Sequence, residues 1–193
     1  TLGNLAAFWQ DDIRRLIGWS SVAQAGYVLM AVTVLGLSPD ALSALLAFIA
    51  SYAIGNLAAF AVVAYLRGRT AIADYDGLAK RRPLVATVLV VSFLSLVGIP
   101  PTVGFLGKLA LFMTTVDGGY TWLAVVAAAN TVASLFYYAR VMGRAYFNAP
   151  PEEVAVLDRS SGVAVLIGGV LVLGGALLAG SAFTAFQSSQ LLP

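Results

Sequence analysis

A single lysine, Lys108, lies within one of the most apolar stretches of the chain. The stretch reads FLSLVGIPPTVGFLGKLALF over residues 93–112, and no other charged residue lies between Arg82 and Asp117. Removal from water disfavours the charged form of a lysine, so such a residue can hold or release a proton according to a neighbouring charge. A proton relay requires that property, and Lys108 is therefore the first candidate site residue.

The same stretch predicts a helix that is interrupted just before Lys108. Two prolines remove backbone donors and crowd the preceding turn, and a glycine on either side loosens the backbone. Unwound backbone at membrane depth is tolerated only inside protein or along a wet cavity, and broken helices of this kind mark ion pathways in transporters. The residues predicted to form the break are Gly98, Pro100, Pro101 and Gly104.

Four polar residues in other apolar stretches are candidates for lining a path of water molecules that leads to the lysine. They are Gln24, Tyr52, Asn130 and Tyr137. Helical spacing places Ser20 with Gln24, and Asn130 with Ser134 and Tyr137, on shared faces. Each of the four candidates also fits the ordinary role of hydrogen bonding between membrane helices, and the sequence leaves both roles open.

The composition assigns the chain to the membrane class. Hydrophobic residues make up 60% of its 193 residues and charged residues 10%, against about 25% charged residues in soluble domains. The chain contains no cysteine and no histidine, which removes thiolate sites and the commonest metal ligand. It has no phosphate-binding loop and no dinucleotide fingerprint, so the sequence gives no support to a redox cofactor, a bound nucleotide or a nucleic-acid partner.

The hydropathy pattern predicts an all-α, polytopic transmembrane bundle with about five spans, the third of which is discontinuous. An α-helix needs roughly 20 apolar residues to cross the hydrocarbon core, and continuous apolar runs favour helices over a barrel. The predicted spans cover residues 16–37, 42–66, 84–115, 121–147 and 163–186. The polar link between the second and third spans predicts a short surface helix that begins near Asp74, with Asp76 and Gly77 in its first turn.

The positions of the basic residues predict the orientation of the chain. With five spans, ten of the eleven Lys and Arg residues fall on one face, which the positive-inside rule places in the cytoplasm. Lys108 is the exception. A lysine can snorkel to an interface, but here the snorkel would point to the face from which the other basic residues are absent.

The chain starts within an apolar segment, so residues 1–13 are interpreted as the tail of a preceding helix. The whole of residues 1–193 is interpreted as one membrane domain, the C-terminal part of a longer protein.

Two longer motifs carry a resemblance to a known family. The segment DIRRLIGWSSVAQAGY (12–27) is similar to the family pattern DIKRLLAYSSIAHxGY, and SLVGIPPTVGFLGKLALF (95–112) is similar to SLAGIPPTxGFxGKxxLF. In the same order, YYARV (137–141) resembles the segment YYYLRV. The chain thereby resembles the antiporter-like membrane subunits of proton-pumping NADH:quinone oxidoreductase (respiratory complex I), most closely the N type.

The resemblance implies a bacterial inner-membrane protein whose partners are the other membrane-arm subunits and the lipid bilayer. It implies that NAD, FMN, iron–sulfur clusters and quinone belong to other subunits, and that Lys108 is a protonation site. Two positions depart from the pattern: Arg14 replaces a lysine, and Gln24 replaces a histidine that is often found there. Arg14 keeps the charge but cannot titrate usefully, and Gln24 can relay protons only through water.

Two alternatives remain open at this point. One is a subunit of a multisubunit cation/proton antiporter or of a membrane-bound hydrogenase, because such proteins use similar broken helices. The other is a structural membrane subunit that holds an assembly together without moving ions.

Overall fold

In the computed structural model, the described part of the chain comprises residues 1–66, 69–150 and 159–188, and within α8 the side chains of residues 162–177. Arg67 and the side chain of Arg159, two of the basic residues used above, lie outside the described residues. The elements are, in order, α1 (Leu2–Phe8), α2 (Ile13–Val32), α3 (Ala41–Tyr65), the 3-10 helix η1 (Ile72–Tyr75), α4 (Leu78–Arg81), α5 (Pro83–Val97), α6 (Val103–Asp117), α7 (Thr121–Phe147) and α8 (Arg159–Ser188). The predicted all-α class is confirmed for these residues.

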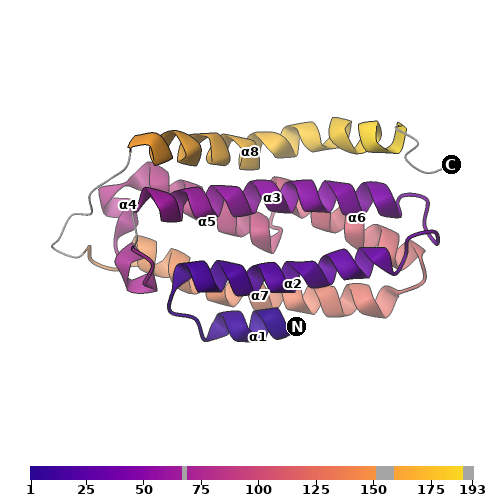
Figure 1. Cartoon of the computed structure of the whole chain (residues 1–193), viewed down its shortest axis with the longest axis horizontal. Coiled ribbons are helices and arrows are strands. Elements are labelled where there is room, and N and C mark those ends of the chain that lie inside the picture. Colours follow the sequence, from indigo (N-terminus) through magenta and orange to yellow (C-terminus); the bar gives the residue numbers. More distant parts are fainter. Residues whose placement is uncertain (67–68, 151–158, 189–193) are drawn as a thin grey trace.

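The long helices lie side by side along the long axis of the molecule (Figure 1). Helix α3 packs against α8, α6 and α5, and α2 packs against α1, α3 and α7. Helices α5 and α6 follow one another with a short non-helical segment, residues 98–102, between them. This arrangement brings the last residues of α5 within reach of side chains from α2 and α6.

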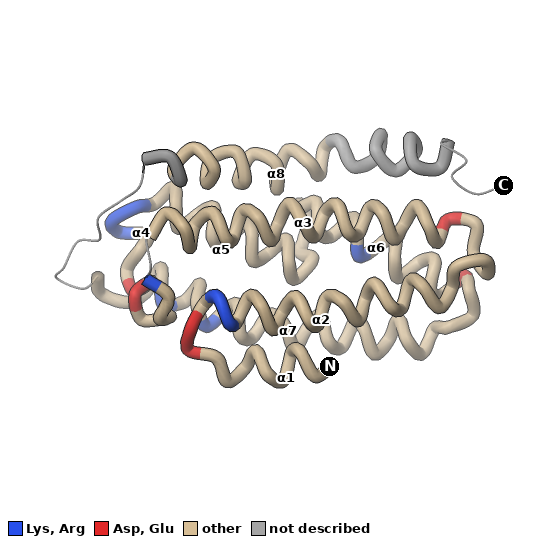
Figure 2. Tube along the Cα trace, viewed as in Figure 1, with Lys and Arg blue, Asp and Glu red and all other residues tan. Residues whose placement is uncertain are grey.

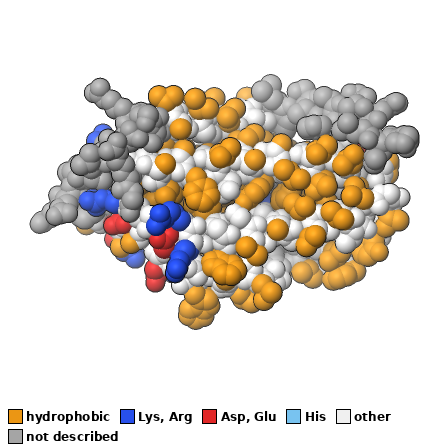
Figure 3. Space-filling view, in the orientation of Figure 1, with side chains coloured by type: hydrophobic (Ala, Val, Ile, Leu, Met, Phe, Trp, Pro, Cys, Tyr) orange, Lys and Arg blue, Asp and Glu red, His pale blue; other side chains and the backbone are white. Residues whose placement is uncertain are grey.

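Apolar side chains occupy both the interior and the outer surface of the bundle. Phe93, Leu89 and Val141 are fully buried, whereas Leu57 and Leu177 are 70% and 89% exposed. The space-filling view shows hydrophobic side chains spread over the visible flank, with charged side chains confined to one end (Figure 3). Helices α3 and α7 are long and apolar enough to cross a membrane, while α5 and residues 162–177 of α8 are shorter apolar segments.

Basic residues lie almost entirely at one end of the bundle. Lys and Arg gather at the end that holds α4 and the start of α2, here called the basic end (Figure 2). Acidic positions occur at both ends, beside the basic residues and also at the start of α3 and the end of α6. One further blue position lies within α6, and Lys108 is the only Lys or Arg in that helix. Lys108 is therefore separated from the other described basic residues in the structure as well as in the sequence.

Residues 69–82, here called the strap, close part of the basic end. The predicted surface helix was wrong in its limits: Asp76 and Gly77 lie between η1 and α4, and Gly77 has a φ of +61°. On one side, the amide of Ile13 donates to the Thr70 carbonyl at 2.7 Å. On the other, Arg144 of α7 donates two hydrogen bonds to the Asp76 carboxylate at 2.7 and 2.9 Å. The strap thus ties the start of α2 to the end of α7.

The Asp76–Arg144 pair predicts a pH-dependent contribution to stability. Hydrogen bonding by the Arg144 guanidinium lowers the pKa of Asp76 from its ordinary value. A carboxylate with a lowered folded-state pKa stabilises the fold above its unfolded pKa of about 4, and this contribution is lost as the pH falls through the lowered value. Because Arg144 is 39% exposed, solvent screening limits the pair, and Asp76→Asn is expected to cost about 1 kcal/mol at pH 7.

The measurement is the unfolding temperature of the detergent-solubilised protein between pH 7 and pH 3. The difference between wild type and Asp76→Asn should shrink toward the acid end, and Arg144→Gln should add little once Asp76 is replaced. A difference that stays constant over this pH range would show that the charge of Asp76 contributes nothing.

Candidate functional site

The interruption between α5 and α6 is built by a left-handed glycine. Helix α5 ends at Val97, and Gly98 adopts a φ of +91°. The amides of Gly98 and Ile99 both donate to the Leu94 carbonyl at 2.9 Å. Helix α6 begins at Val103, so Pro100 and Pro101 lie in the non-helical segment, as do Ile99 and Thr102. This turn leaves the last carbonyls of α5 free to accept hydrogen bonds from outside their own helix.

Lys108 supplies those hydrogen bonds. Its Nζ donates to the Leu96 carbonyl at 2.8 Å and to the Val97 carbonyl at 2.9 Å, and these two oxygens are here called the cradle. The side chain is only 4% exposed. Its stem passes over Gly98, where an added Cβ would approach the lysine Cδ to 2.8 Å. The lysine of α6 therefore reaches back across the break and binds the end of α5.

A second glycine fixes the distance between the two helices. The Gly104 amide donates to the Ser95 hydroxyl at 3.1 Å. A Cβ at Gly104 would overlap the Ser95 carbonyl oxygen and lie 2.7 Å from the Ser95 carbonyl carbon. The start of α6 thus lies directly against the backbone of α5, which brings Lys108 within reach of the cradle.

Gln24 is the one predicted path residue that shares a partner with Lys108. Its Nε2 points to the Leu96 carbonyl at 3.5 Å, the long limit of a hydrogen bond. The side chain is 2% exposed, and its Oε1 is buried without a hydrogen-bond partner among the described residues. A buried acceptor of this kind is costly unless a water molecule or another donor reaches it. Gln24 Oε1 is therefore a candidate acceptor for water beside the cradle.

Tyr27 was not among the residues predicted from the sequence. Its ring lies under the lysine, with Nζ 4.7 Å from the ring centroid. Its hydroxyl hydrogen-bonds the Thr131 hydroxyl at 2.7 Å and lies 2.9 Å from the Ala127 carbonyl. Tyr27 could have been chosen from the sequence, because it follows Gln24 by three residues and so lies on the same face of the helix.

Asn130 and Tyr137 are linked to each other through Asn4, and neither is hydrogen-bonded to Lys108. The Asn4 amide nitrogen donates to the Asn130 side-chain oxygen at 3.0 Å and to its carbonyl at 2.9 Å. The Tyr137 hydroxyl donates to the Asn4 side-chain oxygen at 3.0 Å. Asn4, which the sequence analysis did not single out, therefore joins α1 to the polar face of α7.

Tyr52 belongs to a group of hydroxyls between α2, α3 and α7. It donates to the Ser21 hydroxyl at 2.6 Å, and the neighbouring Ser20 hydroxyl lies 2.5 Å from the hydroxyl of Tyr138. These contacts satisfy buried hydroxyls within the bundle. Ser20 and Ser21 precede Gln24 on α2, so both contacts lie nearer the basic end than Gln24 does.

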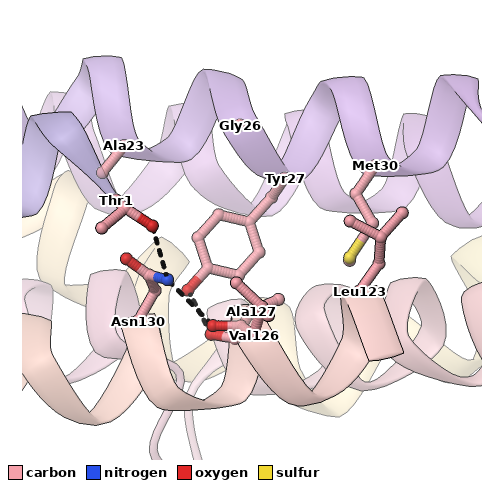
Figure 4. Close-up of a pocket in the computed structure, with 9 residues that line it drawn as sticks. All are labelled: Thr1, Ala23, Gly26, Tyr27, Met30, Leu123, Val126, Ala127 and Asn130. Carbon is pink, nitrogen blue, oxygen red and sulfur yellow. Dashed lines mark hydrogen bonds between the residues drawn. The ribbon is translucent and has the colours of Figure 1, made fainter. Parts of the chain in front are cut away.

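A pocket of about 100 Å³ lies beside Tyr27, between the start of the chain, α2 and α7 (Figure 4). Its polar lining comes from Asn130, Thr1 and Tyr27, and its apolar lining includes Met30 and Leu123. The volume suffices for a few water molecules at about 30 Å³ each. The close-up shows the hydroxyl of Tyr27 directed to α7 and the Asn130 amide directed to Thr1. Tyr27 thus contributes to both the pocket and the surroundings of the lysine.

The described residues contain no cluster of three or more acidic side chains suited to a metal ion. Nor does any carboxylate among them form an ion pair with Lys108. The groups that surround the lysine nitrogen here are backbone carbonyls and an aromatic ring. The chemistry that this arrangement supports is the binding and exchange of one proton on a buried amine.

Comparisons with known proteins found relatives over most of the chain. Residues 1–134 match a family model described as NADH:quinone oxidoreductase/Mrp antiporter, transmembrane. NADH-quinone oxidoreductase subunit N 1 of Streptomyces griseus is 51% identical over 191 residues, 98% of this chain and 40% of the relative. Subunit N of Mycobacterium sp. (strain JLS) is 48% identical over 177 residues, 90% of this chain and 38% of that protein.

A solved structure of similar fold is that of respiratory complex I from Thermus thermophilus with bound aureothin. One of its chains is 32% identical and superposes with a TM-score of 0.80, covering 95% of this chain and 42% of its own length. The chain therefore spans about two-fifths of the length of the curated relatives it matches.

Proposed function

Because this chain belongs to the NADH:quinone oxidoreductase/Mrp antiporter membrane family, we propose that it is part of a proton-translocating subunit of NADH:quinone oxidoreductase. The subunit couples quinone reduction, which takes place elsewhere in the complex, to proton transport across the membrane. The observation that carries the proposal is the buried Lys108 amine, which is held at the break between α5 and α6. The proposed partners of the subunit are the other membrane-arm subunits, and the redox cofactors belong to other chains.

The proposed mechanism is electrostatic. Quinone reduction changes charges along the membrane arm, and a positive charge that approaches Lys108 favours its neutral form, whereas a negative charge favours the ammonium. Lys108 then exchanges a proton with water on the side of the bundle away from the basic end. Gln24, whose Oε1 has no hydrogen-bond partner among the described residues, points to the same Leu96 carbonyl as Lys108 and lies beside this exchange. Asn130 lines a more distant part of this path. Tyr52 and Tyr137 lie toward the basic end instead, and we propose that they line the water path on that side of Lys108.

The proposal includes a topology. Helices α2, α3, α7 and α8 each cross the membrane once, and α5 with α6 forms a fifth, discontinuous span. The basic end faces the cytoplasm of a bacterium, as the positive-inside rule requires. The clustering of Lys and Arg at one end of the bundle supports this orientation (Figure 2).

The test uses inverted membrane vesicles from cells that contain the whole complex. Oxidation of NADH with added quinone is expected to acidify the vesicle lumen in sodium-free buffer, and vesicles from cells lacking this subunit should show no such acidification. The matched control is a quinone-site inhibitor on wild-type vesicles. Proton movement that needs sodium and continues without NADH would instead favour a cation/proton antiporter, the second candidate, which the description of the family also covers.

A further inference from the structure

We propose that Tyr27 is a positioning residue for Lys108, whose ring face favours the protonated lysine and whose hydroxyl fixes that ring to α7. The inference rests on the proposed function, since it assumes that Lys108 exchanges protons. It adds a residue that acts through the lysine rather than on the proton itself.

The position of the ring suits a cation–π interaction. Such interactions operate when the cation lies within about 6 Å of the ring centroid, and they strengthen when the pair is removed from water. Here the distance is 4.7 Å, and Lys108 and Tyr27 are both only 4% exposed. The carbonyls of the cradle favour the ammonium through hydrogen bonds, and the negative face of the ring adds a second attraction.

Two independent sets of contacts hold the ring in place. The Tyr27 hydroxyl binds the Thr131 hydroxyl and the Ala127 carbonyl, both on α7. The ring also stacks on Phe48 of α3, with centroids 5.9 Å apart, and on Phe112 of α6, with centroids 6.1 Å apart. A shift of α7 relative to α6 would therefore move the ring relative to the lysine nitrogen. This gives α7 a physical means of changing how firmly Lys108 holds its proton.

Among the described residues, Tyr27 is the one titratable side chain whose ring faces the Lys108 nitrogen. Helix α5 and residues 162–177 of α8 contain no titratable residue. On α3, Tyr52 bonds Ser21, and Tyr65 lies at the basic end of that helix. On α7, Tyr137 and Tyr138 bond Asn4 and Ser20. The remaining charged groups of α2, α6 and α7 lie at helix ends: Arg14, Arg15, Asp117, Arg140, Arg144 and, with them, Tyr146.

The test compares Tyr27→Leu with Tyr27→Phe in vesicles that contain the whole complex. The readout is the pH at which NADH-driven proton transport falls to half on the alkaline side. Loss of the ring weakens the protonated form of Lys108, so Tyr27→Leu should move this point to lower pH by about one unit. Tyr27→Phe keeps the ring face. Its transport should therefore fall to half at a pH within a few tenths of a unit of the wild-type value, even if its maximal rate of transport differs.

A profile that does not move in Tyr27→Leu would overturn the inference, as would an equal shift in Tyr27→Phe, because the hydroxyl would then account for the effect. Should Tyr27→Leu fail to assemble, replacement of Tyr27 by a trifluorinated phenylalanine keeps the ring's shape and removes its negative face. That replacement should produce the same acid shift, and its absence would equally overturn the inference.

Lys108→Gln separates this inference from the proposed function. If Lys108→Gln transports protons normally, the proposed function fails, and the inference about Tyr27 fails with it. If Lys108→Gln is inactive while Tyr27→Leu leaves the pH profile in place, only the role of Tyr27 is overturned.

Discussion

Replacing Lys108 by methionine is expected to reduce NADH-driven proton transport at least tenfold per assembled complex. The effect should be this large because the side chain is the proposed carrier of the proton, and loss of a positioned proton-transfer group costs about 10²–10⁴-fold in rate. Methionine keeps the length and the apolar stem of the side chain, so the bundle should retain its packing. Initial rates of lumen acidification, divided by the amount of assembled complex, give the measurement.

The hydrogen bonds of Lys108 make a second variant necessary. Its Nζ binds the Leu96 and Val97 carbonyls, and leaving buried carbonyls unsatisfied costs about 1–3 kcal/mol. Lys108→Gln retains a donor for the cradle but cannot carry the proton, so it should assemble and still fail to pump. Leu109→Met, on the next residue of α6 and 41% exposed, is the matched control and should pump normally. Wild-type pumping in both Lys108 variants would contradict the prediction.

Gly104→Ala is expected to destabilise the subunit by about 3 kcal/mol or more. The new methyl group would overlap the Ser95 carbonyl oxygen, which is part of the α5 backbone and cannot rotate away as a side chain could. The two helices would have to separate, which would move Lys108 away from the cradle. Both the yield of assembled complex and its unfolding temperature in detergent should fall.

Gly143→Ala provides the matched control for this prediction. Gly143 also lies within a helix, and a Cβ there would meet nothing within 4 Å. Alanine is the better helix former by up to about 1 kcal/mol, so this variant should be as stable as wild type or slightly more so. Equal stability of the Gly104→Ala and Gly143→Ala variants would show that the close approach of α5 and α6 is unimportant.

The helices were predictable from the sequence because long apolar runs admit few other structures. The predicted fourth segment, 121–147, coincides with α7. The first was predicted to reach residue 37, but α2 ends at Val32. The apolar run continues through Val34 and Leu35, so hydropathy gave no sign of the end of the helix. The backbone turns there nonetheless, with Gly36 at a φ of +82°.

Lys108 could be singled out from the sequence as a lysine removed from water, but its surroundings could not be predicted. Its isolation from other charges is visible in the sequence, and its burial agrees with the interpretation of an amine removed from water. The cradle consists of backbone oxygens, which carry no residue signature, and its position depends on the turn at Gly98. Tyr27 was missed because an aromatic residue in an apolar helix resembles ordinary core packing until the lysine is seen above it.

The polar stripe on α7 was predicted correctly as a shared face, yet its partner was not. Asn130 and Tyr137 both bond Asn4, a residue on α1 that is separated from them by more than 120 positions. Pairing over such a distance follows from the packing of α1 against α7 and cannot be read from helical spacing alone. The resemblance to antiporter-like subunits of NADH:quinone oxidoreductase, drawn from three segments, is confirmed by the family match and by the relatives.

The central claim is that Lys108 takes up and releases a proton during turnover. Lys108→Arg tests it most directly, because arginine keeps the positive charge and can bind the cradle but cannot be deprotonated in a protein. The measurement is the number of protons moved per NADH oxidised in vesicles that contain the assembled variant. We predict that this ratio falls below the wild-type value in the variant. An unchanged ratio would contradict the claim, since a permanently charged side chain would then do all that the lysine does.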